Sequence, residues 1–404
     1  MQEKPLQSLT FLKISDTMSE IYLDNGGTTK IDKEVLVAMM PYLEEEYGNP
    51  SAIYKKGMDS KDAIDHAREI IAKSINANPE EIIFTSGGTE SNNLAIKSIA
   101  FTNKDKGNHI ITTTTEHKCV LDSCKWLSKQ GFEITYLSVD NEGFVNLEEL
   151  NKTITDKTIL VSIAHGNNEI GTIQDLAAIG TVCKKHNVYF HTDACQSYTK
   201  TILDVDAQNL DLVTINAHKI NGPKGIGAVY IRKGTRIDAW QHGGDQENRK
   251  RAGTENVPAI VGFGKAVEIA NQGNVKHMAR LRDYLIKKLL QIPEVRLNGP
   301  AGNERLCNNV NVSFHSIEGE SIGEFLDLEH ISTSTGSACA AKSLDPSHVL
   351  TAIGLTHEEC NGSLRLTLSK YSTKEDIDAL LEVLPGIVTR LREISPVWRK
   401  KEHV

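Results

Sequence analysis

The chain has 404 residues, of which 39% are hydrophobic and 24% are charged, so it is long enough to bury a large core and to divide into two domains. Its net charge of -8, without a long basic run, argues against nucleic acid as a main partner. No apolar run approaches the roughly 20 residues of a membrane span. We therefore expect a soluble globular protein that acts without a membrane.

The N-terminus and the cysteines indicate a compartment. Residues 1–20 lack the length and the cleavage pattern of a secretory signal, and we expect them to form a flexible extension. The seven cysteines form no C-x-x-C pair and show no metal-type spacing. An odd number of such cysteines predicts free thiols in a reducing, cytoplasmic environment and no metal site.

Between residues 80 and 235, short apolar runs alternate with helical patterns. We expect seven strands, at Ile82–Thr85, Ile110–Thr114, Ile134–Leu137, Ile159–Ala164, Val188–His191, Leu212–Ile215 and Ala228–Ile231. Helical patterns lie at Glu90–Ala100, Val120–Lys129 and Asp175–His186. This alternation predicts an α/β fold with a mainly parallel seven-stranded sheet covered by helices on both faces. In such sheets ligands bind beyond the carboxyl ends of the strands.

Polar residues follow several of these strands. Gly87-Gly88-Thr89 precedes a helix and could cradle a phosphate at the helix N-terminus, although a simple turn with Thr89 as N-cap is about as good an interpretation. His117 follows the second strand, where a lone histidine is more often packed or capping than catalytic. Asn167-Asn168 follows the fourth strand and could bind a polar group or close a turn.

Lys219 ends the run that begins at Leu212, beside His218 and close to Lys224. A lysine near a second cation loses its proton more easily and can attack aldehydes. Taken alone, Lys219 would be a solvated loop lysine, and Asp193, which follows the preceding strand, would be a helix cap. Pyridoxal phosphate, however, requires such a lysine, a carboxylate for its ring nitrogen and a helix N-terminus for its phosphate. The ordered set predicts this cofactor, with His117 available to stack on its ring.

These residues carry a resemblance to cysteine desulfurases of the NifS/IscS type, which are pyridoxal phosphate enzymes of fold type I in the class V aminotransferase group. The similarity runs from about Ile21 to Ser369. The matching runs are Tyr22–Asn25 with Thr28-Thr29, Phe84–Asn93, Glu116-His117, Asn167–Gly171, His191–Gln196, Ala217–Gly227 and Arg251–Asn256.

The resemblance implies a role for each residue of the cofactor site. Lys219 would bind the cofactor aldehyde, Asp193 would pair with its ring nitrogen, and Gln196 would bind its ring hydroxyl. His117 would stack on the ring and move protons, and Asn168 would help to position the substrate. The residues implied at the phosphate are Gly88, Thr89, Asn216, His218 and, from a neighbouring subunit, Thr254, so the resemblance also implies a homodimer with shared active sites.

The second half of the chain supplies the sulfur chemistry. Ile331–Ala341 is rich in small residues, so a thiol there can be exposed, although an arbitrary cysteine is more often a buried structural residue. Gly336–Cys339, followed by Ser347–Leu350, resembles the long catalytic loop of group I members, which makes Cys339 the persulfide carrier. Arg365 lies on an alternating run, Ser363–Ser369, and matches the arginine that binds the substrate carboxylate.

We expect a large cofactor-binding domain at 21–272, whose first residues pack on the small domain, and a small α+β domain at 273–404 with the cysteine loop. A helical pattern at Asn271–Gln291 leads into the small domain, and a second one at Asp376–Arg392 looks broken near Pro385-Gly386. The chain departs from the family pattern at Asn216, where Ser or Thr is usual, and at Gly26-Gly27, where an Ala pair is common.

The expected activity is conversion of L-cysteine to L-alanine, with sulfur passing to Cys339 and then to an acceptor such as an iron-sulfur scaffold or a thiolation protein. Selenocysteine lyase activity would use the same site, and a class V aminotransferase would not need Cys339. A cofactor-free scaffold of the sulfur machinery is the alternative outside enzymes, and the intact Lys219 and Asp193 argue against it.

Overall fold

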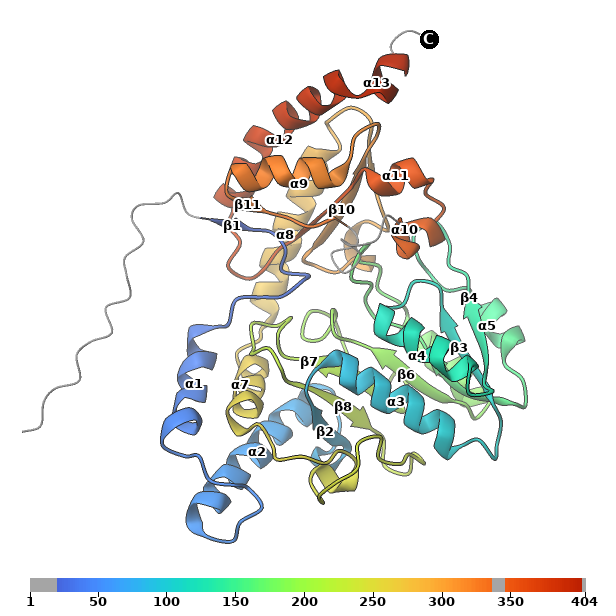
Figure 1. The fold of residues 1–404 in the computed structure, drawn as a ribbon, viewed down its shortest axis with the longest axis vertical. Coiled ribbons are helices and arrows are strands. Elements are labelled where there is room, and N and C mark those ends of the chain that lie inside the picture. Colours follow the sequence, from blue (N-terminus) through green and yellow to red (C-terminus); the bar gives the residue numbers. More distant parts are fainter. Residues whose placement is uncertain (1–19, 336–345, 402–404) are drawn as a thin grey trace, which may run out of the picture.

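The computed structural model describes residues 20–335 and 346–401 (Figure 1). A seven-stranded sheet forms its largest element, in the order β2-β8-β7-β6-β5-β3-β4. The strands are β2 (Ile82–Thr85), β3 (His109–Thr113), β4 (Glu133–Leu137), β5 (Thr158–Ser162), β6 (Tyr189–Asp193), β7 (Leu212–Asn216) and β8 (Gly227–Ile231). Only β8 runs antiparallel to its neighbours. The predicted mainly parallel sheet is confirmed.

Helices cover both faces of this sheet. Successive strand residues point to opposite sides, so each face carries its own set of apolar side chains. Ile83 and Ile110 pack with α3 (Gly88–Thr102) and α4 (Lys118–Ser128). Their neighbours Phe84 and Ile111 enter a second core. That core includes residues of α2 (Lys55–Ser74), α6 (Leu176–Lys185) and α7 (Val257–Glu268), and α1 (Lys33–Glu44) lies against α7. All strand residues of β2, β5, β7 and β8 are buried, which explains their continuous apolar runs.

A second, antiparallel sheet has the order β12-β10-β9 and comprises β9 (Val295–Leu297), β10 (Asn309–Phe314) and β12 (Ser363–Thr367). It shares a separate core with α8 (Gln272–Leu289), α9 (Gly319–Leu328) and α12 (Lys374–Ile394). Leu23 belongs to this core, and β1 (Ile21–Tyr22) pairs with β11 (Ile331–Ser332). The boundary between residues 272 and 273 stays a prediction.

Shorter elements complete the described chain. They are α5 (Leu147–Thr153), α10 (His348–Ala352), α11 (His357–Asn361), α13 (Pro396–Lys401) and three 3-10 turns at Pro79–Glu81, Glu247–Arg249 and Gly302–Glu304. Across the two described ranges, none of the helices combines the length and the apolar character that crossing a bilayer requires.

The expected break near Pro385-Gly386 is wrong, because α12 continues through both residues. Proline removes one helical hydrogen bond and favours a kink. Here Leu384 and Val388, on either side of the proline in sequence, are both buried in the core beside the antiparallel sheet. Burial of this apolar stripe keeps the two halves of the helix aligned.

Candidate active site

The carboxyl ends of parallel strands bring several of the predicted site residues to one edge of the large sheet. Asp193 is the last residue of β6, and Lys219 lies three residues beyond β7. His117 precedes α4, and Gly88 is the first residue of α3. The structure therefore places these four residues after strands of the same sheet, as the sequence predicted.

The Lys219 amine lies against a turn from the other end of the chain. Its Nζ donates hydrogen bonds to the carbonyl oxygens of Gly26 and Gly27, the latter at 2.6 Å. Burial, together with the cations Arg365 and Lys200, lowers the pKa of Lys219 to about 8. A substantial fraction of this amine is thus unprotonated near neutral pH, as a nucleophile toward an aldehyde requires.

The Asp193 carboxylate is buried and held on both oxygens. Oδ2 accepts a hydrogen bond of 2.6 Å from the side-chain amide of Asn92, and Oδ1 accepts one of 2.9 Å from the backbone N–H of Cys195. Sequence reasoning gave Asn92 no role, although it lies within the matching run Phe84–Asn93. Fixed in this way, the carboxylate presents a negative charge at the sheet edge.

His117 caps α4 through its own ring. Nδ1 accepts the backbone N–H of Cys119 at 3.2 Å and lies 3.0 Å from the Cys119 sulfur. A backbone N–H can only donate, so Nδ1 carries no hydrogen and the neutral ring carries its hydrogen on Nε2. The Asn92 amide lies 3.1 Å from the same sulfur, which links His117 to the Asp193 pair.

The N-terminus of α3 forms a cradle that fits a phosphate. Its N-cap is Gly87, with a φ of 148°, and this cap makes no side-chain hydrogen bond to the helix. A Cβ on Gly88 would lie 2.6 Å from the Cys195 sulfur, so glycine lets the chain approach closely. Thr89 therefore does not cap the helix, and the first N–H groups are available to an anion.

Two amides and a hydroxyl adjoin this cradle. Asn216 is buried, its side-chain nitrogen would lie 3.5 Å from a Cβ on Gly88, and its Oδ1 has no partner within the described ranges. Thr89 stands in the first turn of α3, and burial is the main cause that raises the pKa of the Cys119 thiol to about 12. Gln196 donates to the Gly26 carbonyl at 3.0 Å, which is also a Lys219 acceptor.

His218 and Thr254 are the two other predicted phosphate ligands. His218 Nδ1 is 3.2 Å from the Thr28 hydroxyl, and burial, together with Lys219 and Lys224, lowers the pKa of His218 to about 4. Thr254 is exposed, in the segment that precedes α7. Its predicted contact with a phosphate in a neighbouring subunit stays a prediction.

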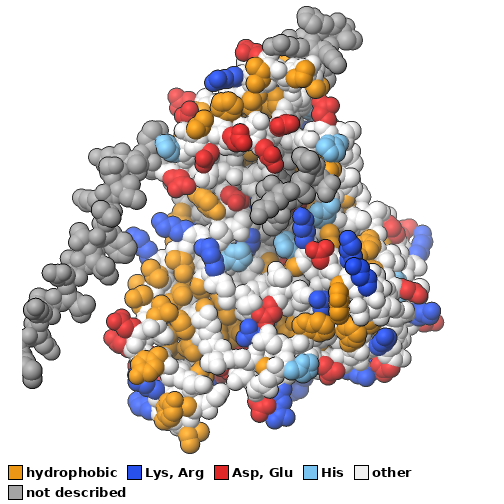
Figure 2. All heavy atoms as spheres, in the orientation of Figure 1, with side chains coloured by type: hydrophobic (Ala, Val, Ile, Leu, Met, Phe, Trp, Pro, Cys, Tyr) orange, Lys and Arg blue, Asp and Glu red, His pale blue; other side chains and the backbone are white. Residues whose placement is uncertain are grey.

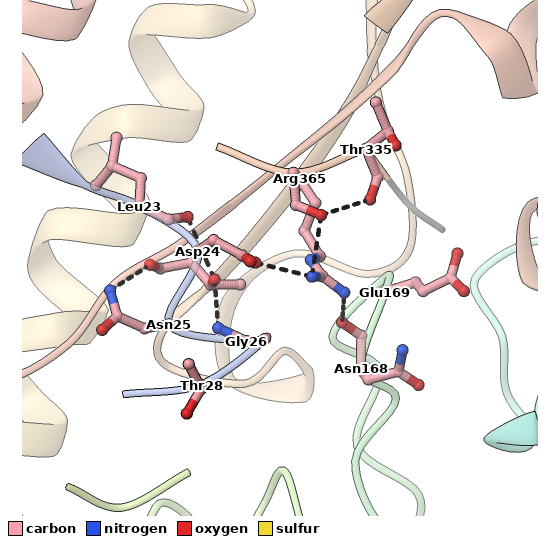
Figure 3. Close-up of polar contacts among 12 residues, drawn as sticks. Leu23, Asp24, Asn25, Gly26, Thr28, Asn168, Glu169, Thr335 and Arg365 are labelled. Carbon is pink, nitrogen blue, oxygen red and sulfur yellow. Dashed lines mark hydrogen bonds and ion pairs between the residues drawn. The ribbon is translucent and has the colours of Figure 1, made fainter. Parts of the chain in front are cut away.

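Arg365 extends from β12 toward the loop that carries Asn168 (Figure 3). Nη2 forms an ion pair with Asp24 at 2.9 Å and also contacts the Ser334 hydroxyl at 3.3 Å. Nη1 donates to the backbone oxygen of Asn168 at 3.1 Å, while Nε has no partner in residues 20–335 or 346–401. The predicted pair Asn168 and Arg365 is thus together, and Asp24 joins it.

Glu169 lies behind this group. It is buried, and its side chain accepts a hydrogen bond from Ser347, the N-cap of α10. Burial raises the pKa of Glu169 to about 7, against a smaller opposite effect of Arg365. Cys339, the predicted sulfur carrier, lies outside the described residues. The six described cysteines are free, and none of them is exposed.

The residues present fit pyridoxal phosphate. The fit rests on an amine whose pKa is lowered, a buried carboxylate after the neighbouring strand and a helix N-terminus without a side-chain cap. Lys219, Asp193 and the start of α3 would hold the aldehyde, the ring nitrogen and the phosphate of this cofactor.

Comparison with known proteins shows which family the chain belongs to. The family model for aminotransferase class-V matches residues 21–380, so the chain belongs to that class. A protein of Methanosarcina thermophila named cysteine desulfurase IscS is 52% identical over 391 residues, which cover 96% of each chain. Within the class, the chain belongs to the cysteine desulfurase family, a family of enzymes, and this confirms the resemblance carried by its motifs.

Solved structures agree with this assignment. A structure described as a NifS-like protein superimposes with a TM-score of 0.87 at 38% identity, covering 92% of this chain and all of the other. A structure described as SspA in complex with cysteine gives a TM-score of 0.79 at 38% identity, covering 88% of this chain. Both similarities support the predicted fold of type I pyridoxal phosphate enzymes.

Proposed function

We propose that this protein converts L-cysteine to L-alanine and transfers the sulfur atom through Cys339 to an acceptor, with pyridoxal phosphate as cofactor. The observation that carries the proposal is the convergence of Lys219, the buried Asp193 and the Arg365 Nε, which has no partner among the described residues, at one edge of the large sheet. The relative described in complex with cysteine supports L-cysteine as substrate.

The cofactor, when bound, supplies an electron sink for the substrate's α-carbon. Asp193 would place a negative charge opposite the ring nitrogen, and the start of α3 with Gly88, Thr89, Asn216 and His218 would hold the phosphate. Lys219, whose pKa is about 8, accepts the α-proton of the substrate at Nζ. His117 would lie at the ring with its Nε2 hydrogen available to donate, and Gln196 would hold the ring hydroxyl.

The sulfur step uses the chain's own thiol. Cys339 as thiolate attacks the sulfur of L-cysteine, an S–S bond forms, and the bond between Cβ and sulfur breaks. The electron pair of that bond remains with the carbon fragment, which takes up protons to become L-alanine. The persulfide on Cys339 then passes its outer sulfur to a thiol or iron-sulfur acceptor, or releases it as sulfide when a reductant is present.

We further propose a homodimer. Large apolar side chains gather on α1, on the start of α2 and on the loop between them (Figure 2). The exposed members are Leu36, Val37, Met40, Leu43, Tyr47, Ile53, Tyr54 and Met58. A patch of this kind is typical of a protein interface. In the dimer Thr254 would reach the phosphate in the partner's site.

The free thiols favour a reducing, cytoplasmic setting.

The test is incubation of the protein with L-cysteine and a reductant, with sulfide and alanine measured for the wild type, Lys219→Ala and Cys339→Ala. Equimolar sulfide and alanine from the wild type, lost in both variants, is the expected result. A cofactor-loaded wild type that forms no sulfide would contradict the proposal. If Cys339→Ala keeps full activity with keto-acid acceptors, the chain is an aminotransferase. A marked preference for L-selenocysteine would make it a selenocysteine lyase.

A further inference from the structure

The hydrogen bonds of Arg365 leave one edge of its guanidinium incomplete. An arginine has five N–H hydrogens, and Nη2 directs both of its own to protein acceptors, Asp24 Oδ1 and Ser334 Oγ. Nη1 donates to the Asn168 carbonyl. Nε is buried and has no acceptor in the described part of the chain. An unpaired N–H on a buried cation is costly, so this atom marks the place of an absent acceptor.

Asp24 is tied to the strand that carries Arg365. Its backbone forms a β-bridge with Thr367, two residues beyond Arg365 on β12. Gly26, two residues after Asp24, donates its N–H to the Thr367 hydroxyl at 2.6 Å. The Asp24 carboxylate and the Arg365 guanidinium therefore have a fixed relative position, although 341 residues separate them in sequence.

The turn after Asp24 depends on a glycine. A Cβ on Gly27 would lie 2.5 Å from Asp24 Oδ2, which is closer than van der Waals contact allows. The Gly27 N–H donates to the Asp24 carbonyl at 3.0 Å and closes the turn. Glycine at this position lets the carboxylate fold over the turn and reach Arg365.

The same turn holds the Lys219 amine through the Gly26 and Gly27 carbonyls. The charged and titratable groups that face Lys219 are Arg365, Lys200, His218, Asp24 and Cys195. Arg365 and Lys200 lower the pKa of Lys219, and Asp24 and Cys195 raise it. Asp24 thus offsets the effect of Arg365 on Lys219 while it holds the guanidinium in place.

We propose that Asp24 is a positioning residue for substrate recognition: it orients Arg365 so that the Nε–H donates to the α-carboxylate of an amino acid, and it couples this arginine to Lys219. This inference rests on the proposed function, because it assigns the carboxylate of that substrate to Nε. A carboxylate is the chemical match for a guanidinium edge.

Two variants separate orientation from charge. Asp24→Asn keeps an oxygen that accepts from Nη2 but removes the negative charge, and Asp24→Ala removes both. We expect the Ala variant to raise KM for L-cysteine about tenfold or more, because the guanidinium loses a hydrogen bond between two charged groups. Its kcat should change less than about threefold, and the Asn variant should keep KM within about threefold of the wild type.

The second readout needs no turnover. Cofactor-free protein is mixed with pyridoxal phosphate at a series of pH values, and the initial rate of absorbance change is recorded. The rate rises with pH as Lys219 loses its proton, with a midpoint near pH 8 in the wild type. Both Asp24 variants should shift this midpoint to lower pH, because an anion near the ammonium is lost. Asp105→Asn, which removes an exposed carboxylate paired with Arg236, is the matched control.

Either of two results overturns the proposal: Asp24→Ala leaves KM unchanged, or Asp24→Asn raises KM as much as Asp24→Ala does. Should Asp24→Ala not fold, Gly27→Ala serves instead, because its Cβ would displace the carboxylate without removing it, and it should also raise KM. A wild type that forms neither sulfide nor alanine contradicts the proposed function. In that case the midpoint shift of cofactor uptake still tests the coupling of Asp24 to Lys219.

Discussion

The cofactor half and the substrate half of the site are built in different ways. Gly88, His117, Asp193 and Lys219 all lie near strand ends of one sheet, within residues 82–231 of the chain. The Arg365 group combines β12 of the second sheet with Asp24 from the N-terminal segment and Asn168 from the large-sheet half. The first half follows from the order of strands in one sheet, whereas the second depends on pairing between distant segments.

This difference determines how each half responds to change. A strand end in a buried parallel sheet is fixed by many backbone hydrogen bonds, so one side chain there can be replaced without moving the others. The substrate half has few redundant contacts, and a single side chain such as Asp24 connects its parts. We expect substitutions in the cofactor half to change the reaction rate while the geometry of the site stays the same. Substitutions in the substrate half should change the affinity for the substrate.

The largest effect is expected at Asp193, which gives the cofactor half its negative charge. Asp193→Asn keeps the size and shape of the side chain but removes the charge opposite the ring nitrogen. We expect the rate of alanine formation to fall by about 10²–10⁴, the usual magnitude for a group that controls proton transfer. Cofactor absorbance, recorded on the same samples, reports occupancy.

The matched control is Asp211→Asn. Asp211 is also near β6 and β7, where it accepts the Phe190 N–H at 2.8 Å, but it precedes β7 and so lies at the opposite end of that strand. The Asp211→Asn variant should form alanine at the wild-type rate per folded molecule. A retained rate above about one tenth in Asp193→Asn would contradict the role of its charge.

A smaller effect is expected at Glu169, where the two halves meet. Its carbonyl accepts from Asn309 of β10, and its side chain accepts from Ser347. Its pKa is raised from 4.5 to about 7, so ionisation costs stability: the cost is absent below pH 4.5, grows up to about pH 7 and is constant above. The full cost is about 3 kcal/mol.

Glu169→Gln removes this cost because the amide does not ionise. Urea unfolding should show the variant gaining on the wild type as pH rises from 4.5 to 8, up to about 3 kcal/mol. Glu148→Gln, at a side chain that is 86% exposed, should show no such trend. A difference between Glu169→Gln and the wild type that is the same at pH 5 and pH 8 would refute the assignment.

The smallest effect is expected at Asn216, the departure from the family's Ser or Thr. Its amide contributes one donor to a cradle that already has helix N–H groups. Asn216→Ala should weaken pyridoxal phosphate binding by about tenfold or less, since one hydrogen bond is worth roughly 0.5–1.5 kcal/mol. Equilibrium titration of cofactor-free protein measures this. Asn216→Ser retains a donor and should bind within about threefold of the wild type, and a loss above a hundredfold would show that the helix cradle alone is inadequate.

Sequence patterns predicted the large sheet and its strand ends because each strand is an unbroken apolar run followed by a polar turn. Asp193 and Lys219 stand at the ends of two strands that are consecutive in sequence and paired in the sheet, so the order of the strands predicts their proximity. Cys339 was also singled out, on its local motif, and it lies outside the described residues.

What the sequence could not predict depends on partners that are remote along the chain. Asp24 stands in a matching run, yet nothing local indicates that it pairs with Arg365, and Asn92 gave no sign that it holds Asp193. The raised pKa of Glu169 arises from burial by several segments at once. The continuity of α12 through Pro385 likewise depends on the core beneath it.

The β-bridge between Asp24 and Thr367 has a consequence for synthesis of the protein on the ribosome. The last strand of the large sheet ends at Ile231, whereas Arg365 is made 134 residues later, which takes roughly 7 to 27 seconds at 5–20 residues per second. During that interval the N-terminal turn has no β12 to pair with. A nascent chain can therefore complete the sheet that carries Lys219 before it has any means of recognising an amino-acid substrate.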